Sequence, residues 1–146
     1  MGTFYTSCRL ENPMDRKRTV QVSRLLVDSG SEFTWVDAET LKKIGVKRER
    51  KDYTFVVANG QQITRPIGFA IIHVNDAVTV DEVVFAEAGD LQLLGARSLE
   101  GLNLRVDGRA KKLVAGGPIL AASGLTIISG DSTADAAQKV VREARN

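Results

Sequence analysis

Near the start of the chain, two short apolar runs flank a small polar turn, and this arrangement limits the possible folds more than any other feature. The first run, residues 25–27, stops abruptly at Asp28, and the second, residues 33–36, follows the turn. Short apolar runs bounded by turn residues are typical of buried β-strands. Gly30 lets the backbone turn tightly between them. We therefore expect a mainly β domain with Asp28 at the end of a core strand.

Turn signals between β-prone runs predict four β-hairpins. These hairpins join residues 3–10 to 19–27, the runs around Asn59-Gly60, residues 66–74 to 78–86, and the runs around Asp107-Gly108. Asn-Gly and Asp-Gly are the strongest short signals for such a connection. The basic residues 16–18 lie in the turn-rich stretch of the first hairpin, so we expect them at its solvated tip.

Helix signals are few and short. Asp37 as N-cap and Gly45 beyond the end predict a first helix, and residues 96–101 a second helical turn. Ser132 begins a capping-box pattern, which predicts a C-terminal helix. The Gly-Gly-Pro sequence from residue 116 marks a boundary. We expect a main domain over residues 1–115 and an extension over residues 116–146, serving as a dimerisation or cover segment.

The composition excludes several classes of function. The chain has 20 basic and 18 acidic residues and a net charge of +2, which gives no footprint for nucleic acid. Cys8 is the only cysteine and His73 the only histidine, so neither a disulfide framework nor a metal site is predicted. A Ser-His-Asp arrangement with His73 stays open, although Gly-x-Ser-x-Gly is absent. No membrane span or signal peptide is expected, so we expect a cytoplasmic location.

The sequence Leu-Val-Asp28-Ser29-Gly30-Ser31 resembles the active-site signature of the retroviral-type aspartic proteases, the retropepsins. The resemblance is to the small bacterial single-domain members and covers about residues 1–115. It implies a closed, β-barrel-like retropepsin (acid protease) fold with two short helices. It also implies that Asp28 is catalytic, that Gly30 and Ser31 hold the carboxylates in plane, and that Ser29 bonds across a dimer.

Two later stretches extend this resemblance. Leu93, Leu94 and Gly95 resemble the downstream apolar-apolar-Gly element of the family, which packs beneath the catalytic loop.

The hairpin at Ala58, Asn59 and Gly60 follows the catalytic turn and first helix, as the family's mobile flap does. The resemblance implies that these three residues present backbone to the substrate. An ordinary hairpin is the alternative.

Peptide hydrolysis by aspartic acid needs two carboxylates and a water, with one carboxylate as base and the other as acid. Only one convincing Asp-Ser-Gly is present, because the near-echo at Asp131 lacks the glycine. Two chains must therefore contribute, and a symmetric homodimer brings two copies of Asp28 together. The expected activity is that of an aspartic endopeptidase acting on a peptide or protein substrate, without a metal or other cofactor.

Two other interpretations remain. The chain could be a catalytically silent retropepsin-like module that binds peptides or scaffolds a partner, because fold does not imply function. It could also be a closed β domain whose Asp-Ser-Gly is only a turn, since all three residues favour turns.

Overall fold

The computed structural model describes residues 3–121. The chain divides into two compact units, residues 1–115 and residues 116–146. Residues 116–121 form neither helix nor strand. The predicted helix from Ser132 lies outside the described residues, as does most of the predicted extension.

The first unit is built mainly from strands, which confirms the predicted mainly β class with two short helices. In chain order the elements are β1 (Tyr5–Asn12), β2 (Asp15–Val27), β3 (Thr34–Asp37), α1 (Ala38–Lys43), β4 (Arg50–Val56), β5 (Gln62–Val74), β6 (Ala77–Ala86), β7 (Leu93–Leu94), α2 (Ala96–Gly101), β8 (Leu104–Asp107) and β9 (Lys112–Ala115).

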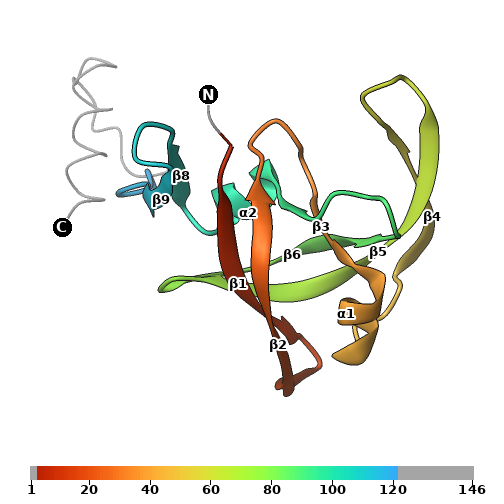
Figure 1. Ribbon diagram of the computed structural model, residues 1–146. Coiled ribbons are helices and arrows are strands. Elements are labelled where there is room, and N and C mark those ends of the chain that lie inside the picture. Colours follow the sequence, from red (N-terminus) through yellow and green to blue (C-terminus); the bar gives the residue numbers. More distant parts are fainter. Residues whose placement is uncertain (1–2, 122–146) are drawn as a thin grey trace, which may run out of the picture. The chain divides into compact units, whose positions relative to one another are not determined.

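Seven of these strands form one sheet in the order β1-β2-β7-β3-β6-β5-β4 (Figure 1). β1 also pairs with β5, where Arg9, Leu10 and Glu11 lie opposite His73, Ile72 and Ile71. β8 and β9 form a separate two-stranded sheet. The β4–β5 hairpin projects from the rest of this unit, on the right of Figure 1.

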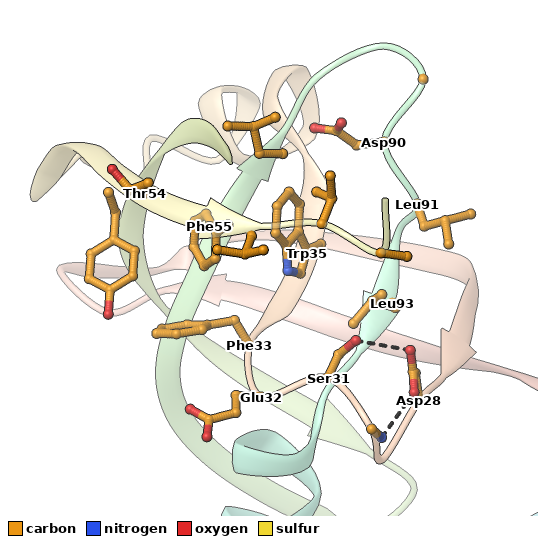
Figure 2. A pocket seen from close by; sticks show the side chains of 17 residues that line it. Asp28, Ser31, Glu32, Phe33, Trp35, Thr54, Phe55, Asp90, Leu91 and Leu93 are labelled. Atoms are coloured by element: carbon orange, nitrogen blue, oxygen red, sulfur yellow. Dashed lines mark hydrogen bonds between the residues drawn. The ribbon is translucent and has the colours of Figure 1, made fainter. Parts of the chain in front are cut away.

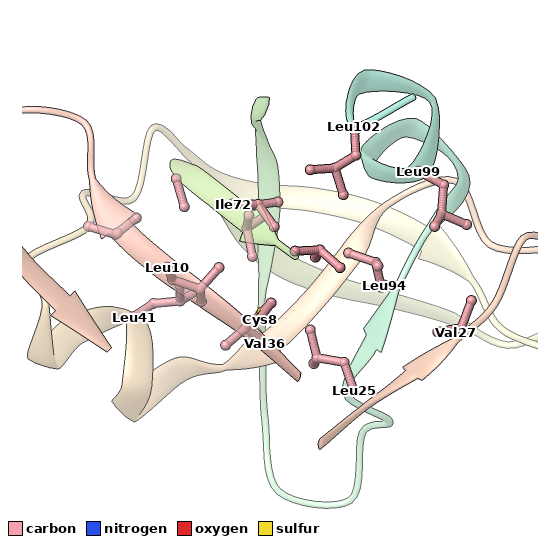
Figure 3. Close-up of a cluster of buried hydrophobic side chains, with 14 of the residues drawn as sticks. Cys8, Leu10, Leu25, Val27, Val36, Leu41, Ile72, Leu94, Leu99 and Leu102 are labelled. Carbon is pink, nitrogen blue, oxygen red and sulfur yellow. The ribbon is translucent and has the colours of Figure 1, made fainter. Parts of the chain in front are cut away.

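One large apolar cluster holds these elements together (Figure 3). Its fully buried members include Leu10 of β1, Leu25 of β2, Val36 of β3, Leu41 of α1 and Leu94 of β7. Burying a leucine or valine side chain contributes about 1.5–3 kcal/mol. The strands on either side of the Asp28 turn are therefore anchored in the core, which leaves the turn little freedom to move.

The predicted helix after β3 and the four predicted hairpins are present, with small shifts in their ends. The Asp37 carboxylate caps α1 by accepting a hydrogen bond from the Thr40 N–H at 3.2 Å. Asn75 makes the β5–β6 turn with a φ of 54°, in the left-handed region that asparagine tolerates. Neither helix in the described part of the chain has the length and apolar character to cross a bilayer.

Residues 16–18 are exposed at this end of the first hairpin, as predicted, but they do not lie in the turn itself. The first hairpin turns at residues 13 and 14, and these basic residues already belong to β2. The Arg16 Nε lies 2.8 Å from the carboxylate of Glu11, which is buried, and this bond lowers the pKa of Glu11. Arg18 donates to the carbonyl oxygen of Lys43 at 2.8 Å. Arg16 and Arg18 therefore have partners on β1 and α1, while their side chains remain exposed to solvent.

Candidate active site

The carboxylate of Asp28 is held by its own loop. Its Oδ1 accepts a hydrogen bond from the Gly30 N–H at 2.9 Å, and its Oδ2 accepts one from the Ser31 hydroxyl at 2.9 Å (Figure 2). The Ser31 N–H also donates to the carbonyl oxygen of Asp28, at 3.2 Å. Hydrogen bonds to a charged acceptor are stronger than neutral ones. The loop therefore orients an acid that is only half-buried and remains accessible.

β7 lies directly against the strand that leads into this loop. Leu93 and Leu94 pair in parallel with Leu26 and Val27 of β2. The Asp28 N–H then donates to the Leu94 carbonyl oxygen at 3.0 Å. Because Leu94 is fully buried, this bond ties the acid to the core.

The start of α2 supports the other side of the loop. The Ala96 N–H donates to the Ser31 carbonyl oxygen at 2.7 Å, and the Arg97 N–H donates to that of Glu32 at 3.1 Å. The first N–H groups of a helix have no partner within the helix, so they are free to hold the loop. Gly95 passes so close that a Cβ on it would lie 2.8 Å from the Glu32 oxygen.

A cleft with a volume of about 710 Å³ opens beside Asp28. This volume falls within the range of about 300–1,000 Å³ that ligand sites typically have. Asp28 and Ser31 lie on one side of the cleft and the aromatic side chains lie beyond Ser31 (Figure 2). The β4–β5 hairpin and the residues just before β7 complete the walls.

Four aromatic rings form one wall of this cleft, and none of them is among the site residues predicted from the sequence. Phe33 and Trp35 enter from the β3 side, and Tyr53 and Phe55 come from β4. Ring centroids lie 4.9 Å apart for Trp35 and Phe55, 5.0 Å for Tyr53 and Phe55, and 5.5 Å for Phe33 and Phe55. The available signal was spacing, because residues i and i+2 of a strand share one face.

Of the other predicted site residues, one lines the cleft and three lie outside it. Ala58 lines the cleft, whereas Asn59 and Gly60 form the exposed tip of the hairpin and lie outside the lining. Gly60 has a φ of 84°, and the Asn59 side chain accepts from the Gln61 N–H at 2.9 Å. Ser29 is exposed and lines a second cavity of about 530 Å³, with residues of α2 and β8.

Asp90 lines the cleft, but its charge is already matched. Arg65 of β5 binds both of its oxygens, at 2.7 and 2.9 Å. Hydrogen bonding to Arg65 lowers the pKa of the Asp90 carboxyl. Bidentate pairs of this kind also fix geometry, so the pair fastens the loop before β7 to β5.

A buried chain of hydroxyls joins β3 to α2. The Gly95 N–H donates to Thr34 Oγ1 at 3.0 Å, Thr34 and Ser98 oxygens lie 2.6 Å apart, and the Ser98 hydroxyl donates to Asp81 at 2.8 Å. A hydroxyl has one hydrogen. Because Ser98 gives its hydrogen to Asp81, Thr34 must donate to Ser98. The hydrogen bonds therefore all run the same way, from the Gly95 N–H to the Asp81 carboxylate, and each hydroxyl both donates and accepts.

We expect Ser98→Ala to lower the free energy of unfolding by about 1–3 kcal/mol, because the buried Thr34 hydroxyl would lose its acceptor. Urea denaturation followed by circular dichroism measures this loss. Ser7→Ala, at an exposed serine of β1, is the matched control and should change stability by less than about 0.5 kcal/mol. Equal stability of the two variants would contradict the one-way chain.

Cys8 and His73 lie outside the cleft lining. Burial raises the pKa of the Cys8 thiol to about 12, so it stays protonated and a poor nucleophile. The His73 Nε2 lies 2.8 Å from a carboxylate oxygen of Glu11, in the β1–β5 pairing. Among residues 3–121, no three His, Cys, Asp or Glu side chains gather in a way that could hold a metal ion.

No model of a known protein family matches the chain, and no curated protein matches it significantly in sequence. The chemistry of the cleft must therefore indicate the function.

Proposed function

We propose that this protein is an aspartic endopeptidase of the retropepsin type that acts as a homodimer. It hydrolyses peptide bonds with a water activated by two Asp28 carboxylates, one from each subunit. The observation that carries the proposal is the Asp28 carboxylate itself. It is oriented by Gly30 and Ser31, is tied to the core through Leu94, and borders a cleft of about 710 Å³.

Two carboxylates are needed because the reaction needs a base and an acid at once. One Asp28 takes a proton from the attacking water, and the other, protonated, polarises the scissile carbonyl and then helps protonate the leaving amine. Two like charges a few ångströms apart cannot both ionise easily, so such a pair shares one proton. This pairing predicts activity on the acid side of neutral.

A two-fold axis beside the Asp28 loop would supply the second carboxylate. Ser29 supports this arrangement, because it is exposed next to the acid and lies on the side of the second cavity. From there its hydroxyl could bond across the interface and brace both loops. Residues of α2 and β8 line the same cavity, so they would adjoin the partner subunit.

The cleft walls favour a peptide as the substrate. Val56 on the β4–β5 hairpin and Leu91, just before β7, are 69% and 66% exposed, and both line the cleft. Apolar side chains that face water around a cleft are typical of a ligand site. The hairpin, with Ala58, Asn59 and Gly60 at its end, acts as the flap that closes over the bound chain.

The strand pairings support a closed, retropepsin-like barrel. β1 pairs with β2 and with β5, and the intervening strands link β2 to β5 through β7, β3 and β6. This set of pairings forms a ring, as a closed barrel requires. β7, which is one strand of this ring, supplies Leu93 and Leu94, and Gly95 follows it at the start of α2, next to the Asp28 loop.

The purified protein should cleave a peptide library at mildly acid pH and should sediment as a dimer at the same concentrations. A peptide analogue with a hydroxyl in place of the attacking water should inhibit it with one molecule per dimer, since transition-state analogues bind more tightly than substrates. Full activity from a monomer would contradict the shared dyad. Peptide binding without any cleavage would instead favour the catalytically silent module.

A further inference from the structure

The cleft is acidic although the chain is not. The whole chain has 20 basic and 18 acidic residues, yet Asp28, Glu32 and Asp90 line the cleft with no lysine, arginine or histidine. Asp90 is paired with Arg65, and Asp28 is assigned to the chemistry. The charge left to meet a ligand is that of Glu32.

Glu32 is exposed, and no other residue in the described part of the chain bonds its carboxylate. Its backbone oxygen, by contrast, accepts from the Arg97 N–H at 3.1 Å. The side chain lies beside Phe33, beyond Ser31 as seen from Asp28 (Figure 2). The backbone of Glu32 is therefore fixed, while its exposed side chain, at the border of the cleft, has no partner of its own among the described residues and can turn to meet a ligand.

The two arginines nearest to the aromatic wall have other partners. The Arg97 guanidinium stacks over Phe33 at 4.8 Å and lies 3.5 Å from a carboxylate oxygen of Glu82. Arg50 stacks over the Tyr53 ring at 5.6 Å and lies 3.9 Å from the other Glu82 oxygen. Glu82 therefore binds both cations, and neither is paired with Glu32.

The surface next to Glu32 suits a long cationic side chain. Lysine and arginine lay their alkyl stems along apolar surface and keep the charged end at a polar group. The half-buried rings of Tyr53 and Phe55, which pack against the buried Phe33, offer such a surface, and aromatic faces also attract cations directly. Glu32, beside Phe33, adds the opposite charge at one end of the aromatic wall.

We propose that Glu32 determines specificity by selecting substrates with a lysine or arginine beside the scissile bond. The alkyl stem lies against the aromatic wall and the cationic end meets the Glu32 carboxylate. This inference rests on the proposed peptide-cleaving function. In a two-fold dimer each half of the cleft has its own Glu32, so a cation is favoured on either side of the bond.

The test uses three peptides that differ at one position beside the cleaved bond: lysine, norleucine and glutamate. Norleucine keeps the whole alkyl stem of lysine and lacks the charge. At about pH 6 the parent should show kcat/KM about fivefold higher for lysine than for norleucine, as one exposed ion pair allows. The glutamate peptide should be the poorest, and added salt should reduce the differences.

Two variants of Glu32 make the test specific. Glu32→Gln should remove the difference between lysine and norleucine, and Glu32→Lys should reverse the order so that the glutamate peptide is best. A parent that cleaves all three equally would overturn the inference while leaving the protease function intact. A lysine preference that survives Glu32→Gln would overturn it as well.

Binding separates this inference from the proposed activity. The same three peptides, with the scissile bond replaced by an uncleavable isostere, are titrated into Asp28→Asn protein and into the Asp28→Asn, Glu32→Gln double variant. Tighter binding of the lysine peptide that is lost in the double variant supports the role of Glu32 even if the parent cleaves nothing. Equal binding of all three peptides to the Asp28→Asn protein contradicts it.

Discussion

Asp28→Asn should reduce peptide cleavage by at least about a thousandfold, as expected when the group that transfers the proton is removed. The amide has nearly the size of the carboxylate. Its oxygen can still accept from the Gly30 N–H, and its NH2 group can donate to the Ser31 hydroxyl oxygen. The fold and the dimer should therefore persist. Initial rates on a peptide that the parent cleaves, together with sedimentation and circular dichroism, measure both expectations.

Two other aspartates provide controls for this change. Asp90→Asn alters an acid that lines the same cleft but is bound by Arg65, so it should cost some stability and leave cleavage within about tenfold of the parent. Asp131→Asn alters the near-echo of the motif and should leave cleavage unchanged. Parental activity in Asp28→Asn, or an equal loss in either control, would mean that Asp28 is not the catalytic acid.

Gly95→Ala should be among the most damaging single-methyl changes in the protein. An added Cβ would lie 2.3 Å from the carbonyl oxygen of Phe33 and 2.6 Å from its carbonyl carbon. Both are backbone atoms, which cannot rotate away. Gly95 itself has a φ of −93°, which alanine adopts easily, so crowding alone opposes the substitution. Overpacking of this kind costs about 1–3 kcal/mol, and we expect a value near the upper limit.

The same change should also reduce cleavage, because the segment that must shift carries the bonds from α2 to the Asp28 loop. Gly60→Ala is the matched control. Its Cβ would meet nothing within 4 Å, but its φ of 84° is unfavourable for alanine by about 1–2 kcal/mol. Guanidinium denaturation and peptide cleavage should show a larger loss for Gly95→Ala in both measurements. A Gly95→Ala protein as stable as the parent would contradict the close approach.

The sequence predicted the parts of the fold that depend on neighbouring residues. Asp37 caps α1 and Asn75 makes its turn because side chains three residues apart or less decide those conformations. The Asp28 loop itself could be anticipated for the same reason, since Gly30 and Ser31 bond the acid two and three positions away.

Contacts between distant residues could not be predicted from one sequence. Thr34 and Ser98 are 64 positions apart, and neither carries a local signal that it belongs to a buried hydrogen-bond chain. The aromatic wall likewise depends on β4 folding over β3, which places Phe55 against Trp35. Arg16 was assigned to a turn because its partner, Glu11, lies across a hairpin whose exact register the sequence does not give.

Trp35 has a consequence for observing this molecule in solution. It is the only tryptophan in the chain, it lines the cleft, and its ring lies 4.9 Å from that of Phe55 on the β4–β5 hairpin. All tryptophan emission of the native protein therefore comes from the cleft, and indole emission changes with contact with water. Opening of the hairpin or binding of a peptide should therefore change the tryptophan fluorescence, so that both can be followed without an added label.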